Sequence, residues 1–265
     1  MAMQQCHITM AFELLSAAYQ GCLCTMRVLL QAGGDPNTCK DDGTSLLLFA
    51  AQEGHESVVR VLLEAGADAN MVSNSGMTPL FKATLKGYTS VVRALLEAGA
   101  DFNRAINNGA TPIFMAVQKG YESVVRALLE AGADPNTGVT NNGTTPLFMA
   151  TQKGYTSVVL LLLQAGAYPN MAKNNGMTAL ILAALRGYAA IVFALTCGGA
   201  NPNVATNDGQ TPLLIAVQRG HHDAVRELMR AGAWDSRAWA FAQSQHDEEM
   251  MRALLEDVPA SPDLG

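Results

Sequence analysis

The stretch GYTSVVRALLEAGADFN at residues 87–103 returns almost unchanged as GYESVVRALLEAGADPN at residues 120–136. A third and altered copy, GYTSVVLLLLQAGAYPN, occupies residues 154–170. A glycine ahead of each copy keeps the same period, with successive spacings of 33, 33, 34, 33 and 33 residues between Gly43, Gly76, Gly109, Gly143, Gly176 and Gly209. A constant period of this length indicates a repeat architecture in which each copy is one small supersecondary unit.

Each repeat begins with the signals of a short helix. In residues 76–108, Thr78 is suited to cap a helix whose first residue is Pro79, because the first N–H groups of a helix have no intrahelical partner. This helix should end near Gly87, since glycine readily adopts the left-handed conformation beyond a helix C-terminus. The pattern therefore predicts a first helix of about two turns.

A second helix and a turn complete the repeat. Val91, Val92 and Leu95 recur at helical spacing, and the helix is expected to stop at Gly99. The following stretch, residues 101–109, is rich in Asn and ends in Asn-Gly, which suits a tight hairpin-like turn with positive φ. Each repeat is thus predicted to be a helix, a turn, a helix and a projecting finger loop.

One such helix pair has apolar residues on two sides, so it cannot bury both faces unless it stacks on its neighbours. A small residue at one position of the first helix supports close stacking. Alanine fills this position in every copy, as Ala17, Ala50, Ala83, Ala116, Ala150, Ala183, Ala216 and Ala242. The sequence therefore predicts one continuous core built by neighbouring pairs.

The motifs TPLFKA, TPIFMA, TPLFMA, TALILA and TPLLIA, each followed by a glycine and an apolar second helix, resemble ankyrin repeats. The resemblance implies an all-α solenoid of stacked helix-turn-helix repeats with hairpin-like finger loops, in which the first helices line the concave surface. The chain departs from the family at the histidine of T-P-L-H. We expect apolar packing to replace that histidine at Leu48, Phe81, Phe114, Phe148, Ile181 and Leu214.

The repeat pattern also predicts the domain organisation. Residues 1–257 are expected to form a single ankyrin-repeat domain, with six full repeats over 43–235. The N-terminal segment 1–42 and the helix pair at 236–257 are degenerate copies, which suits capping repeats with one face in water. Residues 258–265 are interpreted as a flexible tail.

Composition narrows the class of protein. The formal charge of −6 argues against general nucleic-acid binding, because neutralising phosphates requires surplus Lys and Arg. No apolar run approaches the length of a membrane span, and the first residues lack the layout of a cleavable secretory signal. We expect a monomeric protein of the cytoplasm or nucleus, or of a host cytoplasm if it is a delivered effector, that binds no membrane.

The sequence shows no pattern of a catalytic or cofactor site. Its five histidines are scattered over distant repeats, and its glycines follow the repeat period instead of forming a phosphate loop. The five cysteines lack the paired spacing of a zinc site, so free thiols are favoured over a metal site near Cys6 and His7. The protein is therefore predicted to be non-enzymatic, with no cofactor and no metal.

A row of cations marks the outward side of the predicted first helices. One cation recurs at the end of five consecutive first helices, and a sixth lies one turn earlier in the first of them. These residues, named here the basic stripe, are Lys82, Lys86, Lys119, Lys153, Arg186 and Arg219. They are interpreted either as a binding surface or as ordinary solvated cations favoured by the helix dipole.

Two further rows of residues can be interpreted either as packing or as binding surface. One consists of apolar residues beside the stripe, and the other of tyrosines that open the second helices. The row Phe49, Met115, Met149, Leu182 and Ile215 is expected to pack between repeats more than to line a groove. The row Tyr88, Tyr121, Tyr155 and Tyr188 is expected to pack against the preceding helix more than to contact a partner.

The finger tips vary more than the helices, and variable loops on a regular scaffold are where recognition is customised. The tip residues predicted to contact a partner are Asn74, Met77, Asn107, Asn108, Asn141, Lys173, Asn174 and Met177. A different prediction concerns the asparagine at the base of each finger, which the family resemblance identifies as a target of asparaginyl hydroxylases. The matching residues are Asn70, Asn103, Asn136, Asn170 and Asn203.

The second helices carry an arginine in most repeats, but Leu160 and Phe193 replace it in two adjacent ones. With Tyr168 they form a predicted convex patch, which either supports association with a protein or reflects local repacking.

These patterns lead to one main functional hypothesis and two alternatives. The main hypothesis is a non-enzymatic protein–protein interaction module or scaffold, which binds an extended or acidic protein segment through the concave first-helix face and the fingers. The alternatives are a substrate or regulatory decoy for an asparaginyl hydroxylase, and a host-directed effector that captures a host factor.

Overall fold

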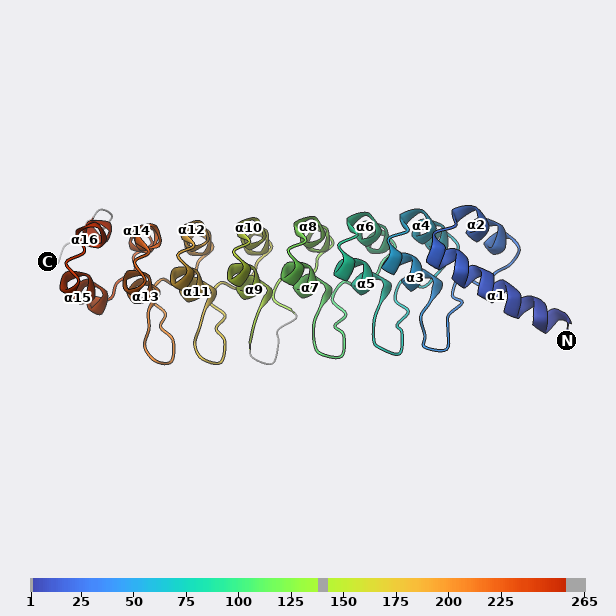
Figure 1. Cartoon of the computed structure of the whole chain (residues 1–265), viewed down its shortest axis with the longest axis horizontal. Helices are drawn as coiled ribbons and strands as arrows, with labels where there is room; N and C mark the ends of the chain where they lie inside the picture. Colours follow the sequence, from blue (N-terminus) through green and yellow to red (C-terminus); the bar gives the residue numbers. More distant parts are fainter. Residues whose placement is uncertain (1, 138–142, 256–265) are drawn as a thin grey trace. The chain divides into compact units, whose positions relative to one another are not determined.

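The computed structural model describes residues 2–137 and 143–255, and this part of the chain is folded into α-helices joined by turns and finger loops (Figure 1). Side chains are described from Thr9 onward. The predicted tail at 258–265 and the predicted contact residue Asn141 lie outside the described residues. The contacts divide the chain into two compact units, Met1–Gly138 and Val139–Gly265.

The first unit consists of four helix pairs, counted over its described residues. Its first helices are α1 (Ala2–Gln20), α3 (Leu46–Glu53), α5 (Pro79–Lys86) and α7 (Pro112–Lys119). Its second helices are α2 (Leu23–Gln31), α4 (Glu56–Glu64), α6 (Thr89–Glu97) and α8 (Glu122–Glu130). Each first helix packs on the next first helix, and each second helix on the next second helix, so the unit is a two-layered stack.

The second unit repeats this plan over its own described residues. Its first helices are α9 (Pro146–Lys153), α11 (Ala179–Arg186), α13 (Pro212–Gln218) and α15 (Ser236–Ser244). Its second helices are α10 (Thr156–Gln164), α12 (Ala189–Cys197), α14 (His222–Arg230) and α16 (Glu248–Leu255). The same helix-on-helix contacts link consecutive pairs, so the stacked all-α repeat architecture is confirmed.

The helix starts and ends predicted from the sequence are confirmed. The Thr78 hydroxyl accepts a hydrogen bond from the Phe81 N–H at 3.1 Å, and Pro79 is the first residue of α5. Gly87 ends this helix with φ of 78°, a conformation that costs residues with a Cβ more than glycine. The same type of hydroxyl cap recurs at Ser45, Thr111, Thr145, Thr178 and Thr211.

The glycine that ends each first helix also makes room for the next repeat. A Cβ added to Gly54 would lie 3.0 Å from the Tyr88 ring, and one added to Gly87 would lie 3.0 Å from the Tyr121 ring. Both distances are shorter than ordinary van der Waals contact. Tyr88, Tyr121 and likewise Tyr188 therefore pack against the preceding repeat, as the packing alternative predicted.

The core lies between the stacked layers. All eight alanines of the small-residue position are at most 3% exposed. The residues that replace the family histidine are also buried, which confirms the expected apolar packing at Leu48, Phe81, Phe114, Phe148, Ile181 and Leu214. Within each unit, a repeat therefore buries its apolar side chains against the neighbouring repeats.

The fingers are closed by backbone hydrogen bonds. In the finger after α6, the Ile106 N–H donates to the Ala110 carbonyl at 3.0 Å, and Gly109 turns the chain with φ of 80°. The Asn-Gly sequence thus forms the tight turn that was expected from it.

Within each unit, asparagines at the bases of the fingers tie one repeat to the next. The Asn70 Oδ1 accepts a hydrogen bond from the Asp101 N–H at 2.7 Å, while its Nδ2 donates to the Gly99 carbonyl at 3.3 Å. In the second unit, Asn170 binds the N–H of Asn201 and the carbonyl of Gly199 in the same way. These residues satisfy backbone groups of the following repeat, a role that the sequence pattern alone did not reveal.

The two ends differ from the internal repeats. Helix α1 is 19 residues long and begins well before residue 12, where the sequence pattern first resembles a repeat, whereas α5 has 8 residues. At the other end, α15 follows its turn without a finger. Asp235 caps α15 by accepting from the Arg237 N–H at 2.9 Å and pairs with the Arg237 guanidinium at 2.7 Å, and Arg237 also donates to the Gly209 carbonyl at 2.8 Å.

Replacing Asn70 with alanine is expected to lower the free energy of unfolding by about 1–3 kcal/mol, because it leaves the Asp101 N–H and the Gly99 carbonyl without their partner. The exposed Asn107, which forms no side-chain hydrogen bond in the described part of the chain, provides the matched control. Urea denaturation of Asn70→Ala, Asn107→Ala and the parent protein would measure the difference. Equal stability of the two variants would contradict the linking role.

Asp235 makes the stability of the last helix pair depend on pH. Its burial raises the pKa of its carboxyl, but hydrogen bonds from Arg237 and Thr211 outweigh burial and hold the pKa below its ordinary value. A carboxyl with a lowered folded-state pKa stabilises the fold above its unfolded pKa of about 3.9, and this contribution is lost as the pH falls through the folded-state value.

Asp235→Asn is therefore expected to flatten the loss of stability that the parent shows on acidification below about pH 4. Thermal unfolding followed from neutral to acid pH would measure this slope. Asp41→Asn, at an exposed aspartate outside this pair, is the matched control for the change of charge. A profile of Asp235→Asn as steep as that of the parent would show that the pair with Arg237 does not control the acid response.

Candidate functional site

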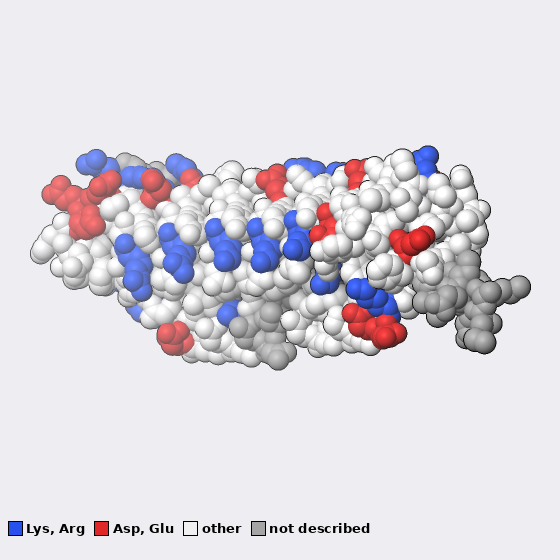
Figure 2. Space-filling view, turned by 45° about the vertical axis from the view of Figure 1, so that its right-hand side comes forward, with Lys and Arg blue, Asp and Glu red and all other residues white. Residues whose placement is uncertain are grey.

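The cations of the basic stripe are placed by the ends of the first helices. Lys86, Lys119, Lys153 and Arg186 are the last residues of α5, α7, α9 and α11, and Arg219 is the residue that follows α13. Each is exposed, and Lys82, one turn earlier in α5, is half-buried. A cation is favoured there by the partial negative charge of a helix C-terminus. Figure 2 shows repeated Lys and Arg side chains, in blue, separated by uncharged surface.

The stripe cations differ from the arginines of the second helices in their partners. In the described part of the chain, none of the six stripe cations lies in an ion pair. In contrast, Arg60 binds Glu97 at 3.1 Å, and Arg93 binds Glu130 at 3.1 Å. The charges of Arg60 and Arg93 are therefore neutralised within the protein, whereas the charges of the stripe cations are available to another molecule.

The electrostatics of Glu56 illustrate this internal neutralisation. A hydrogen bond from Arg60, followed by one from Ser90, lowers the pKa of the Glu56 carboxyl. The bond to Arg60 is 2.9 Å long and joins residues one helical turn apart. Such exposed pairs contribute little to stability. Their effect here is to neutralise the charge of Arg60 within the fold.

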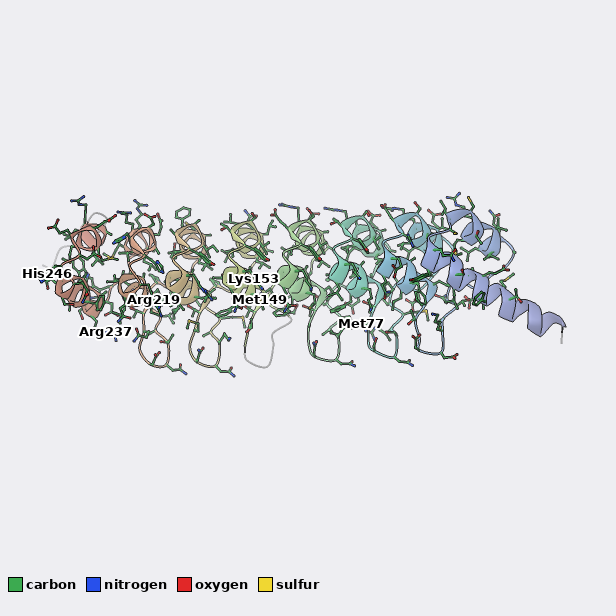
Figure 3. The ribbon with its side chains drawn as sticks, viewed as in Figure 1. Met77, Met149, Lys153, Arg219, Arg237 and His246 are labelled. Atoms are coloured by element: carbon green, nitrogen blue, oxygen red, sulfur yellow. The ribbon has the colours of Figure 1, made fainter. Side chains whose placement is uncertain are left out.

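The surroundings of the stripe combine amide and apolar groups. Gln118, Gln152 and Gln218 directly precede a stripe cation, and all three are exposed. Figure 3 labels Met149 and Lys153, one helical turn apart on α9, together with Arg219. Met149 is half-buried, as are Phe49 and Met115.

The same row is more deeply buried further along the second unit. Leu182 and Ile215 are 7% and 8% exposed. The row therefore packs between repeats there, and it offers partial apolar surface at its methionines.

The predicted contact residues of the fingers fall into two groups. Asn74, Asn107, Asn108 and Asn174 are exposed, whereas Met77, Lys173 and Met177 are half-buried. Some of these groups already have partners within the fold, which reduces their freedom to contact another protein.

Neighbouring finger tips are bonded to one another. The Asn74 N–H donates to the Asp42 carbonyl of the preceding finger at 2.8 Å, and the Asn207 Nδ2 donates to the Asn174 carbonyl at 3.1 Å. Lys173 places its ammonium 5.0 Å from the centre of the Phe148 ring, a cation–π distance. The tips of a unit thus form a mutually supported row and not a set of independent loops.

The asparagines predicted as hydroxylation targets lie at the bases of the fingers. Asn103, Asn170 and Asn203 are exposed, while Asn70 and Asn136 are half-buried. The Oδ1 of Asn103 accepts from the Asp134 N–H, and the Oδ1 of Asn203 accepts from the Trp234 N–H. The prediction of hydroxylation stays a prediction, and the structure adds a structural role for these side chains.

The convex patch lies on the second-helix layer of the second unit. Leu160 on α10 is 44% exposed, Phe193 on α12 is 55% exposed, and Tyr168 is 64% exposed. The helices α10 and α12 pack on each other and contain no charged residue. The apolar side chains are therefore presented to solvent, and their role in association stays a prediction.

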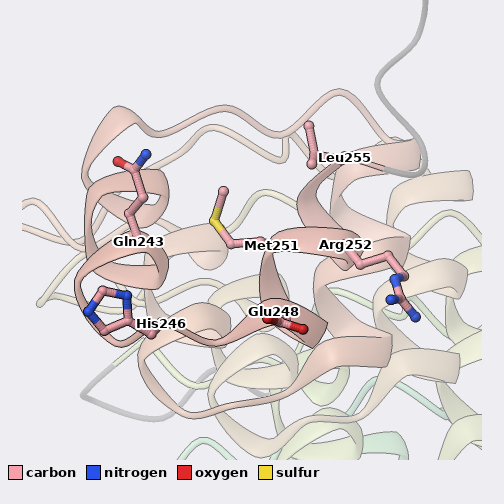
Figure 4. Close-up of a pocket in the computed structure, with 6 residues that line it drawn as sticks. All are labelled: Gln243, His246, Glu248, Met251, Arg252 and Leu255. Atoms are coloured by element: carbon pink, nitrogen blue, oxygen red, sulfur yellow. The ribbon is translucent and has the colours of Figure 1, made fainter.

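The surface depressions do not gather the scattered histidines. The depression in Figure 4, of about 460 Å³, is lined by Gln243, His246, Glu248, Met251, Arg252 and Leu255 of α15, α16 and their connection. His221 and His222 are not among these residues. Within the described residues, no group of three or more His, Cys, Asp or Glu side chains is arranged to hold a metal ion.

The depression at α15 and α16 was missed by the sequence reasoning because this helix pair departs from the repeat pattern. The sequence did contain one indication that this helix pair is unusual. His246 stands where earlier repeats have the glycine that ends the first helix, and its φ is 53°. A histidine in the left-handed region is uncommon and deserves a structural explanation, but the repeat alignment alone assigned it no role.

Comparisons with known proteins were consistent with this architecture. The family model for ankyrin repeats (3 copies) matches residues 14–106, 65–139, 104–173 and 166–238. The crystal structure of the ankyrin repeat domain of Bcl-3, described as a unique member of the IkappaB protein family, aligns with a TM-score of 0.71 and 31% identity over 81% of this chain and 97% of that one.

Two further solved structures are similar. The human ASB11 ankyrin repeat domain aligns with a TM-score of 0.63 and 31% identity over 77% of this chain and 90% of that one. An ankyrin repeat domain from Acinetobacter baumannii AYE aligns with a TM-score of 0.67 and 34% identity over 71% of this chain and 98% of that one. A comparison with curated proteins found no match. Across the described residues, no helix combines the length and apolar character needed to cross a membrane.

Phe193→Arg distinguishes the two interpretations of the convex patch. If Phe193 is a solvent-facing patch residue, arginine should change the free energy of unfolding by less than about 0.5 kcal/mol, as is usual for surface positions. If the residue supports local repacking, the loss should reach about 1–3 kcal/mol. Chemical denaturation measures the difference, and Val192→Arg, at a fully buried neighbour, gives the scale of a packing defect.

Proposed function

Because this chain belongs to the ankyrin-repeat family, whose repeats are generally protein–protein interaction modules, we propose that it binds an acidic protein segment along the basic stripe and the fingers. Members of this family are typically not enzymes. The protein acts in this proposal as an interaction module or scaffold, and its partner is recognised by charge and extended shape.

The observation that carries the proposal is the difference in pairing between the stripe cations and three arginines of the second helices. Arg60, Arg93 and Arg126 are bound by glutamates of the second-helix layer. Five of the six stripe cations are exposed, Lys82 is half-buried, and none has such a partner in the described residues. On a chain with a formal charge of −6, an acidic partner is repelled by most of the surface and attracted to this row.

The surroundings of the stripe support a peptide-like partner. Exposed glutamine amides beside Lys119, Lys153 and Arg219 can donate to backbone carbonyls, and the half-buried methionines offer soft apolar contacts. Exposed ion pairs are individually weak, so affinity depends on several contacts made at once. The length of the surface suits a partner that extends over more than one repeat.

Hydroxylation of the finger asparagines is less favoured by the geometry. Asn70, Asn170 and Asn203 use both ends of their amides to bind the following repeat. An enzyme would have to break these hydrogen bonds to draw the side chain into an active site. Intact-mass measurement after incubation with an asparaginyl hydroxylase tests this alternative, and an added oxygen would support it.

Charge reversal of the stripe provides the test of the proposal. The triple variant Lys86→Glu, Lys119→Glu and Lys153→Glu is expected to bind a fluorescein-labelled polyglutamate peptide at least about tenfold more weakly, because attraction is replaced by repulsion. Its unfolding free energy should change by less than about 0.5 kcal/mol, since all three residues are exposed. Fluorescence anisotropy and urea denaturation measure the two quantities.

The matched control reverses Arg60, Arg93 and Arg126 on the second-helix layer. This variant has the same net charge as the stripe variant, so it separates a local effect from a general change in charge. Affinity close to that of the parent supports the assignment. An equal loss in both variants, or none in the stripe variant, would overturn it.

A further inference from the structure

The second unit presents three stripe cations on consecutive first helices. Lys153 ends α9, Arg186 ends α11, and Arg219 follows α13. Helix α11 packs on both α9 and α13. Packed helices have axes about 8–10 Å apart, so neighbouring cations are expected to repeat at about this distance. The spacing of the cations sets the spacing of the negative charges that fit them.

Few peptide conformations repeat at this distance along one side. A polyproline II helix has three residues per turn and rises about 3.1 Å per residue, which places every third side chain on the same side at about 9.3 Å. A β-strand repeats on one side every second residue, at about 6.6 Å. An α-helix repeats at about 5.4 Å per turn, and reaches about 10.5 Å only with residues seven apart. The polyproline II repeat matches the helix spacing with the fewest residues.

We propose that the second unit recognises an extended, polyproline II-like protein segment with acidic side chains three residues apart. The three carboxylates pair in order with Lys153, Arg186 and Arg219. This inference rests on the proposed function, since it specifies the partner of the same stripe. It adds a requirement that charge alone does not impose, namely the spacing of the acids along the partner.

The groups between the cations suit such a segment. A polyproline II backbone makes no internal hydrogen bonds, so its carbonyls are free to accept from the exposed amides of Gln152 and Gln218. In an α-helical partner the backbone carbonyls already accept hydrogen bonds within the helix, so they would not be free to accept from these glutamine amides. Met149 is half-buried one turn before Lys153 and offers an adaptable apolar contact for a proline ring.

The test uses peptides of identical composition that differ only in the spacing of their acids. The first has glutamates at positions one, four and seven of a proline-rich nonapeptide, the second at one, three and five, and the third at one, two and three. The first is expected to bind about fivefold more tightly than either of the others, because it alone places all three carboxylates opposite cations. Fluorescence anisotropy of labelled peptides at low and high salt measures the affinities.

A charge swap at the centre of the row sharpens the test. Arg186→Glu should weaken binding of the first peptide. A version of that peptide with lysine in place of the glutamate at position four should bind the Arg186→Glu variant to within about twofold of the affinity of the parent pair. Lysine at position five is the control and should not restore binding, because that side chain points away from the row. Arg226→Glu on α14, outside the stripe, should leave the preference among the peptides unchanged.

The outcomes separate this inference from the proposed function. Equal binding of the three peptides, with loss of binding in the stripe variants, would overturn the spacing requirement and leave the acidic partner in place. Absence of stripe-dependent binding to every peptide would overturn both. Tighter stripe-dependent binding of a helical peptide with acids seven apart, or of a single-stranded oligonucleotide, would also overturn the inference and would identify the other class of partner.

Discussion

The structure depends on contact between neighbouring helix pairs, because no pair can bury its own apolar faces alone. The alanine near the middle of each first helix permits the close approach, and it is almost fully buried in every repeat. Tyr88, Tyr121 and Tyr188, which directly precede second helices, lie against the glycine that ends the first helix of the preceding repeat. Asparagines such as Asn70 add hydrogen bonds from one repeat to the next. Stability and shape therefore arise from the same repeated contact.

This contact also determines where charge can serve a function. Stacking buries one side of each first helix and exposes the other. A residue type that recurs at one exposed position therefore forms a row, because equivalent helices lie next to each other. The second helices repeat arginine in the same manner, yet Arg60 and Arg93 are bound to glutamates of the fold. The proposed interaction surface is thus a row of cations on consecutive repeats that have no ion-pair partner in the described part of the chain.

The first and last described helix pairs differ from the internal repeats in how they are built. The last helix pair has no finger before it, and Asp235 and Arg237 take over the link to the preceding finger through the Gly209 carbonyl. The first pair contains a longer helix than the internal repeats.

The sequence by itself determined the period, the helix pairs, their caps and the residues of the core, because these follow from local rules applied repeatedly. The caps at Thr78 and Gly87 and the burial of Phe81 are examples. It also determined which cations share a position. Only the tertiary structure decided which charges have partners, because Arg60 meets Glu97 across repeats while Lys86 meets no acid in the described residues. The spacing of residues along the sequence determines which of them share one face of a helix. Whether a charged residue on that face forms an ion pair depends on the residues of the neighbouring helix.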